Sequence, residues 1–183
     1  MVAVLTESVM IGKIFEAPEF VEITGPLIFL AGPIQGAPQW HHDAIAIIRR
    51  LDRRVSIASP YRHKEPEGEF TEKMFNEQVD WETEYLNCAA QNGVILFWLA
   101  KEAKHSCKRA YAQTSRFELG EWKERTVRLS GTLIVGIEEG FTGARYILRR
   151  FMQDRPHVVI VNNLDELCHR AVHAVQFMDW SHK

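Results

Sequence analysis

The sequence predicts an α/β fold built around a doubly wound, parallel sheet. From Leu27 onward, short apolar runs alternate with longer segments of helical period, which is the pattern of repeated strand–helix units. Each apolar run is continuous rather than alternating, as expected for strands that are buried on both faces. About five such units can be counted, so we expect about five parallel strands flanked by helices.

The elements follow one another along the chain in a regular order. The expected strands are the apolar runs at residues 27–31, 55–58, 94–99, 133–137 and 158–161. The expected helices are the periodic segments that follow them, at residues 39–51, 75–90, 115–125, 142–152 and 164–177. Asn163 directly precedes the last helix and is a typical N-cap residue.

Length and composition favour one domain. The chain has 183 residues, 46% of them hydrophobic, which is enough to bury one sizeable core. We expect residues 27–183 to form this domain. We expect residues 1–26 to form an extended N-terminal arm, because this segment mixes short apolar stretches with Pro18, Gly25 and Pro26.

Charge and cysteine content bound the partners and the compartment. The formal net charge is −2, and basic residues are interspersed with acidic ones, so we do not expect polymeric nucleic acid as a partner. The longest apolar run is too short to cross a bilayer, and the first ten residues do not resemble a signal peptide, so we expect no membrane partner. Three widely separated cysteines suit a reducing compartment, and we expect the cytoplasm.

Metal and acyl-transfer chemistry have no visible basis in the sequence. His169 and His173 are spaced for one helix face, but no cysteine or carboxylate pattern completes a zinc site. There is no Gly-x-Ser-x-Gly motif, and no cysteine has a recognisable nucleophile context. We therefore expect no metal and no organic cofactor, and carboxylates remain as the candidates for chemistry.

A glycine-containing turn follows the first expected strand. It consists of Gly32, Pro33, Ile34, Gln35 and Gly36. Backbone N–H groups in such a turn can approach a phosphate or a sugar hydroxyl, although a plain strand-to-helix turn explains the same residues. Two long loops, residues 63–73 and 101–114, are expected at the same edge of the sheet, where open parallel sheets bind ligands; solvated insertions are the alternative.

Glu82 is an unusual residue for its helix. Helical spacing places Phe75, Val79, Leu86, Ala89 and Ala90 on one apolar stripe, with Glu82 inside it. A carboxylate on a core-facing stripe is costly unless it is paired or its pKa is raised. A position that lines a pocket would explain Glu82, and so would an ion pair with a buried arginine or a helix that starts later.

Glu118 has two interpretations. Ser115-x-x-Glu118 has the spacing of a capping box, in which the glutamate binds the backbone N–H of Ser115. Gly120 follows and lowers helix propensity by about 1 kcal/mol relative to alanine. Such a glycine indicates close approach by another group. Spacing alone leaves Glu118 as a capping residue or as a catalytic carboxylate.

Five short segments, in this order, resemble the nucleoside 2-deoxyribosyltransferase-like family. They are residues 27–34, 58–62, 78–82, 94–98 and 116–122. The resemblance implies a flavodoxin-like fold, a nucleophilic Glu118 in a Glu-Leu-Gly motif, and a Glu82 that contacts the nucleobase. The chain departs from the family pattern at Ala112, where many relatives have an aspartate six residues before the nucleophile.

The resemblance also implies a substrate and a set of contacts. The substrate would be a small nucleoside or nucleotide, cleaved or transferred through a covalent glycosyl–glutamate, in a homo-oligomer that needs no cofactor. Gln35 stands where nucleotide N-glycosidase relatives have a phosphate-binding arginine, so Arg62 or the basic loop 101–109 would have to replace it. The candidate substrate-binding residues are Gly32, Pro33, Ile34, Gln35, Gly36, Arg62, Trp81, Tyr85, Trp98 and Ser115.

Other functions fit the same residues. A nucleotide N-glycosidase or an NAD-type glycohydrolase would use the same glutamate with water as the acceptor. A non-catalytic nucleotide-binding module would keep only the fold. For the three aromatic candidates, Trp81, Tyr85 and Trp98, packing in the core is the alternative to stacking on a nucleobase.

Overall fold

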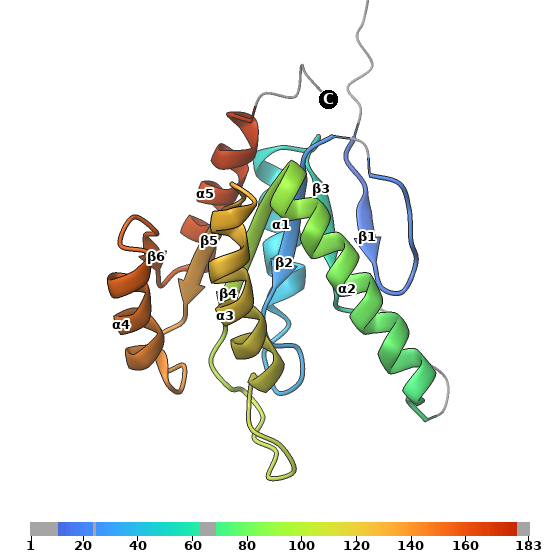
Figure 1. The fold of residues 1–183 in the computed structure, drawn as a ribbon. Helices are drawn as coiled ribbons and strands as arrows, with labels where there is room; N and C mark the ends of the chain where they lie inside the picture. Colours follow the sequence, from blue (N-terminus) through green and yellow to red (C-terminus); the bar gives the residue numbers. More distant parts are fainter. Residues whose placement is uncertain (1–10, 24, 63–68, 179–183) are drawn as a thin grey trace, which may run out of the picture.

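The computed structural model describes residues 11–23, 25–62 and 69–178, and it confirms the predicted parallel α/β fold (Figure 1). Parts of the expected arm (residues 1–10 and 24) and of the first long loop (residues 63–68) lie outside this description. The sheet of the described residues has six parallel strands in the order β1-β3-β2-β4-β5-β6. The strands are β1 (Ile14–Glu16), β2 (Leu27–Ala31), β3 (Ser56–Ser59), β4 (Gly93–Leu99), β5 (Thr132–Ile137) and β6 (Ile160–Val161). The helices are α1 (Trp40–Leu51), α2 (Glu72–Asn92), α3 (Gln113–Arg128), α4 (Ala144–Asp154) and α5 (Leu164–Gln176).

The central strands explain why their sequences are continuously apolar. All residues of β2 and β4 are buried. Phe29 and Phe97 pack with α2, α3 and α4 on one face of the sheet, whereas Leu30 and Leu96 pack with α1 and α5 on the other. Successive side chains point to opposite faces of the sheet, and both faces are covered by helices. Both sets of alternating side chains must therefore be apolar. The prediction from uninterrupted apolar runs succeeded for this reason.

The strand β1 lies in the segment expected to be an extended arm. It pairs in parallel with β3 and forms one edge of the sheet. Only its middle residue, Phe15, is buried, and its ring lies 5.5 Å from that of Tyr85. A strand of three residues with one buried side chain has too little periodicity to be recognised in the sequence.

The apolar stripe predicted for α2 holds only in its second half. Leu86, Ala89 and Ala90 are buried, but Phe75 and Val79 are 51% and 42% exposed. A helix of 21 residues is about 30 Å long, whereas a five-residue strand spans about 17 Å. The first turns of α2 therefore extend beyond the sheet, as Figure 1 shows, and the prediction of a core position for Phe75 and Val79 was wrong.

The carboxyl ends of the strands meet at the lower edge of the sheet in Figure 1. The turn after β2 and the loop between β4 and α3 both lie at this edge. The first turns of α3 begin there as well. No helix of the described residues is long and apolar enough to cross a membrane.

Candidate functional site

Two glutamates from different helices meet in the space between α2 and α3. Glu82 on α2 and Glu118 on α3 are joined by a hydrogen bond between their side chains, and both are partly buried. Two carboxylates cannot hydrogen-bond each other without a proton, because an ionised carboxylate only accepts. The pair therefore holds a shared proton, as carboxyl dyads do.

The surroundings assign this proton to one partner. Burial, the charge and hydrogen bond of Glu82, and the charge of Glu121 raise the pKa of Glu118 to about 8. Burial also raises the pKa of Glu82, but hydrogen bonds from Gln78 and Glu118 and the positive charge of Arg62 oppose this rise. The surroundings therefore favour the proton on Glu118, because only Glu82 has contacts that favour its ionised form.

Gln78 connects the pair to Arg62. Its Nε2 donates to Glu82 Oε1 at 2.7 Å and to the Pro60 carbonyl at 3.1 Å, while its Oε1 accepts from Arg62 Nε at 2.7 Å. Since the amide oxygen receives the guanidinium, the amide nitrogen must face Glu82. Gln78 was not among the residues predicted for the site, although its spacing of four residues from Glu82 places both on one helix face.

The start of α3 contradicts the capping-box interpretation of Glu118. The helix begins at Gln113, and its N-cap residue, Ala112, has a left-handed backbone (φ 54°) and makes no side-chain capping bond. Ser115 is a buried residue within the first turn rather than the cap. The carboxyl group of Glu118 instead faces Glu82.

Arg116 fixes the same turn of α3 from its other side. Its Nη2 donates to the Thr142 carbonyl at 2.7 Å, and its guanidinium lies 4.9 Å from the centre of the Phe141 ring. These contacts tie the residues that flank Glu118 to the loop between β5 and α4. The helical turn that carries Glu118 therefore contacts α2 through Glu118 itself and the loop between β5 and α4 through Arg116.

The glycines of the turn after β2 are explained first by packing. A Cβ on Gly32 (φ +152°) would lie 2.2 Å from the Trp98 carbonyl oxygen and 2.8 Å from the Trp40 ring. The Pro33 carbonyl accepts a hydrogen bond of 2.9 Å from Trp40 Nε1. The close approach of the Trp98 backbone and the Trp40 ring requires glycine at position 32 whether or not a ligand binds.

The loop between β4 and α3 folds onto this turn. The carbonyl of Gly36 (φ +81°) accepts hydrogen bonds of 2.8 and 3.0 Å from the backbone of Ala103 and Lys104. The exposed Gln35 accepts a bond of 2.6 Å from Arg109 Nη1, whereas Ile34 is partly buried. The basic loop thus places Arg109 beside the turn after β2, whereas Arg62 contacts the carboxyl pair through Gln78.

Three aromatic residues expected near the nucleobase lie in the core instead. Trp81 is fully buried, stacks on Tyr85 with ring centres 4.3 Å apart, and donates to the Glu19 carbonyl at 2.9 Å. Tyr85 hydrogen-bonds the backbone of Val21, and Trp98 is only 4% exposed. Their burial favours the core-packing alternative over stacking on a nucleobase.

The described residues contain no group of three His, Cys, Asp or Glu side chains arranged to hold a metal ion. Four measured cavities, of about 460 to 760 Å³, are lined by residues other than Glu82 and Glu118. The carboxyl pair is therefore marked as a site by its chemistry and by its place near the carboxyl edge of the sheet, not by an enclosed volume.

Comparison with known proteins adds a family. A family model described as nucleoside 2-deoxyribosyltransferase like matches residues 25–141. A solved structure, described as a conserved protein from Enterococcus faecalis V583, is 12% identical, with coverage of 82% of this chain and 99% of that chain and a TM-score of 0.49. No curated protein gives a significant match. Because the family model covers well over half of the sequence, including Glu82 and Glu118, the chain belongs to the nucleoside 2-deoxyribosyltransferase-like family.

Proposed function

We propose that this protein cleaves the N-glycosidic bond of a nucleoside or nucleotide, with Glu118 as the nucleophile, and transfers the sugar to an acceptor. The observation that carries this proposal is the proton-sharing pair of Glu82 and Glu118. Paired carboxyl groups with separated pKa values are the standard arrangement for glycosidic chemistry. Membership of the family supports the same class of substrate.

The first step begins with a proton shift inside the pair. The proton moves from Glu118 to Glu82 through their hydrogen bond, which leaves Glu118 ionised. The Glu118 carboxylate then attacks C1′ of the sugar, and the C1′–N bond breaks with its electron pair on the base. Glu82 delivers its proton to a ring nitrogen of the departing base and becomes a carboxylate.

The second step returns the pair to its starting state. An acceptor, either a second base or water, gives up a proton to Glu82 and attacks C1′. The ester bond to Glu118 breaks, so Glu118 leaves as a carboxylate while Glu82 carries the proton, which then passes back to Glu118 through their hydrogen bond. Throughout the cycle Gln78 keeps Glu82 oriented, because its amide hydrogen bonds Glu82 Oε1 and is itself held by Arg62 and Pro60.

A second candidate function is hydrolysis of a nucleoside 5′-monophosphate. The observation that favours it is Arg109, whose guanidinium is held against Gln35 at 2.6 Å beside the turn after β2. An arginine at that position supplies the positive charge that a 5′ phosphate requires. Water would then replace the second base as acceptor.

We also propose that the protein acts as a homo-oligomer. Phe75 and Val79 on α2 and Phe117 on α3 are exposed apolar side chains on the two helices that carry the carboxyl pair, and Phe117 is 75% exposed. Exposed apolar clusters beside a site are typical of protein interfaces. Light scattering of the purified chain should give a mass above one subunit, and Phe117→Glu should reduce it.

The proposed reaction is tested by incubating the protein with a panel of nucleosides and 5′-monophosphates, with and without a second free base. Chromatography follows base release and base exchange. Exchange that depends on the second base identifies a transferase, and release without it identifies a hydrolase. Glu118→Gln should abolish both, and Asp80→Asn, which changes an exposed carboxylate on α2, the helix of Glu82, should leave both unchanged. A protein that binds these compounds but turns none of them over would be a binding module.

A further inference from the structure

A cavity lies at the opposite end of the sheet from Glu118. This cavity of about 760 Å³ is bounded by the start of β5, by residues 155–159 and by the second half of α5. It exists because β6 is short: Ile160 and Val161 pair with Val135 and Gly136, so the first three residues of β5 have no partner on that side. The chain before β6 diverges from β5, and the space between them stays open.

The described lining of this cavity is rich in basic side chains. It includes two arginines and three histidines and contains no aspartate or glutamate: the basic residues are Arg155, Arg170, His157, His169 and His173. The remaining lining is largely apolar, with Leu133, Val158 and Val172 among its members. A volume of this size and composition fits a small ligand that has an apolar body and an anionic group.

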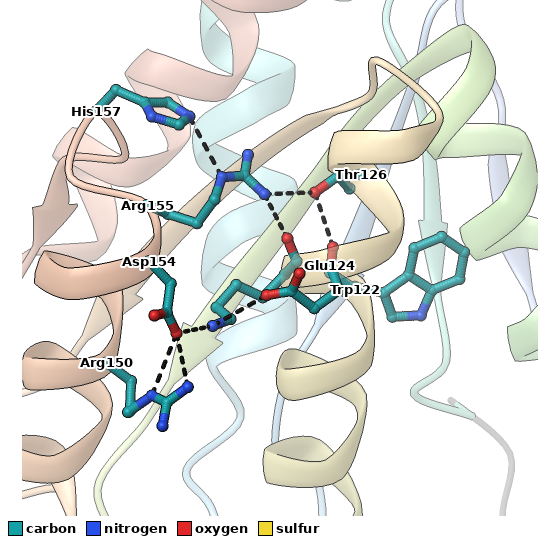
Figure 2. Close-up of polar contacts among 8 residues, drawn as sticks. Trp122, Glu124, Thr126, Arg150, Asp154, Arg155 and His157 are labelled. Carbon is teal, nitrogen blue, oxygen red and sulfur yellow. Dashed lines mark hydrogen bonds and ion pairs between the residues drawn. The ribbon is translucent and has the colours of Figure 1, made fainter.

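Arg155 lines the cavity and is held by several hydrogen bonds, which Figure 2 shows. It is buried, and its Nη1 donates to the Lys123 carbonyl and, at 3.3 Å, to Thr126 Oγ1. Its Nε lies 3.3 Å from His157 Nε2, while its third nitrogen has no contact with the residues drawn in Figure 2. These partners are neutral, and no ion pair to Arg155 is recorded among the described residues.

A buried guanidinium that has only neutral partners retains an uncompensated charge. The neighbouring acid, Asp154, already pairs with Lys123 and with Arg150; Figure 2 shows the pair with Arg150. Arg170, across the cavity, pairs with Glu166 at 2.8 Å. An anion in the cavity would complement Arg155 directly and would receive secondary support from Arg170.

We propose that this cavity binds a small phosphate monoester with an apolar or aromatic body. Donor groups come from two walls, residues 155–157 on one side and α5 on the other. A tetrahedral phosphate presents oxygens toward both walls, whereas a planar carboxylate presents two oxygens in one direction. The apolar residues would hold the body of the ligand.

Phenyl phosphate is a suitable probe, titrated into the full chain by calorimetry and by methyl NMR. The expected result is saturable binding that shifts the methyl signals of Leu133, Val158 and Val172. The same binding should persist in Glu118→Gln, which separates this cavity from the catalytic pair. Absence of these shifts, or equally tight binding of benzoate, would overturn the assignment of a phosphate site.

Matched variants test the cationic lining. Arg170→Gln should weaken binding about tenfold, the loss expected for one charge-assisted contact. Arg50→Gln is the control, because Arg50 is likewise exposed and pairs with an acid of α5, Asp165, but does not line the cavity. Arg155→Lys, checked for a native melting curve, should weaken binding further. Unchanged affinity in Arg170→Gln and in a folded Arg155→Lys would contradict the proposal.

Discussion

A carboxyl group that is partly removed from water and placed against another carboxyl group holds its proton to unusually high pH. This is the situation of Glu118, whose pKa of about 8 reflects burial first and the neighbouring charge of Glu82 second. By contrast, the hydrogen bond from Gln78 and the positive charge of Arg62 act to lower the pKa of Glu82. The two glutamates are chemically different because their neighbours differ. Since the surroundings favour the proton on Glu118, the proposed roles require that proton to pass to Glu82 before Glu118 attacks.

The raised pKa predicts a pH-dependent cost of Glu118 to stability. Below pH 4.5, its ordinary pKa, Glu118 is protonated in both the folded and the unfolded chain. As the pH rises toward about 8, only the unfolded chain releases this proton, so the free energy of unfolding falls. Glu118→Gln removes this loss and should exceed wild type by on the order of a few kcal/mol at pH 8.5, yet by little at pH 5. Urea unfolding at both pH values measures it; an equal difference at both would refute the raised pKa.

The same pair predicts the role of Gln78 as a positioning residue. Gln78→Ala removes the 2.7 Å hydrogen bond that favours ionised Glu82, and it separates Arg62 from the pair. We expect kcat/KM to fall by about tenfold or more, and the acidic limb of the pH–rate profile to move to higher pH. Asn76→Ala, an exposed change on the same helix, is the control. A lower rate with an unmoved profile would mean that Gln78 serves only the structure.

At the scale of elements, continuous apolar runs predicted the long strands because burial on both faces leaves no other composition. Edges were less predictable. The strand β1 was missed because it has one buried residue, Phe15, and α3 begins two residues before Ser115, with Ala112 in a left-handed conformation that the sequence does not indicate. The local sequence pattern therefore located the helices but placed the N-cap of α3 at the wrong residue. The interpretation of Glu118 as part of a capping box was wrong for the same reason.

Gly120 gives a test at this scale. The sequence suggested that another group approaches it, but no atom of the described chain lies within 4 Å of a Cβ placed there. Gly120→Ala should then stabilise α3 by up to about 1 kcal/mol and raise the melting temperature by about 2–4 °C. Calorimetry and light scattering measure the outcome. A lower melting temperature together with a smaller assembly would instead show that a second subunit packs against this position.

At the scale of the whole molecule, the residues of the site come from distant parts of the sequence. Family resemblance identified Glu82 and Glu118, but it could not show that Arg62 reaches Gln78 or that Arg109 reaches Gln35. Both contacts depend on how loops at the carboxyl edge fold back onto the sheet. The burial of Trp81 likewise depends on the N-terminal segment, whose Glu19 carbonyl binds its indole.

This dependence predicts a large effect of Phe15, a residue far from Glu118 in sequence. Its ring is buried against Tyr85 on α2, the helix that carries Glu82 and Gln78. Phe15→Ala should cost about 3–5 kcal/mol of stability, measured by urea unfolding. Ile11→Ala, an exposed change in the same segment, should cost little. A loss below about 1 kcal/mol for Phe15→Ala would show that the N-terminal segment is not part of the core.

The central claim is that Glu118 forms a covalent bond to the sugar, and mass spectrometry of a trapped intermediate tests it most directly. A 2′-fluoro nucleoside slows departure from the glycosyl–enzyme, because fluorine destabilises the oxocarbenium-like transition state. Wild type, digested after incubation with such substrates, should carry the mass of the fluorinated sugar on the peptide that contains Glu118, and Glu118→Gln should carry none. Base release by wild type without any adduct, together with retained activity in Glu118→Gln, would contradict the assignment of Glu118 as the nucleophile.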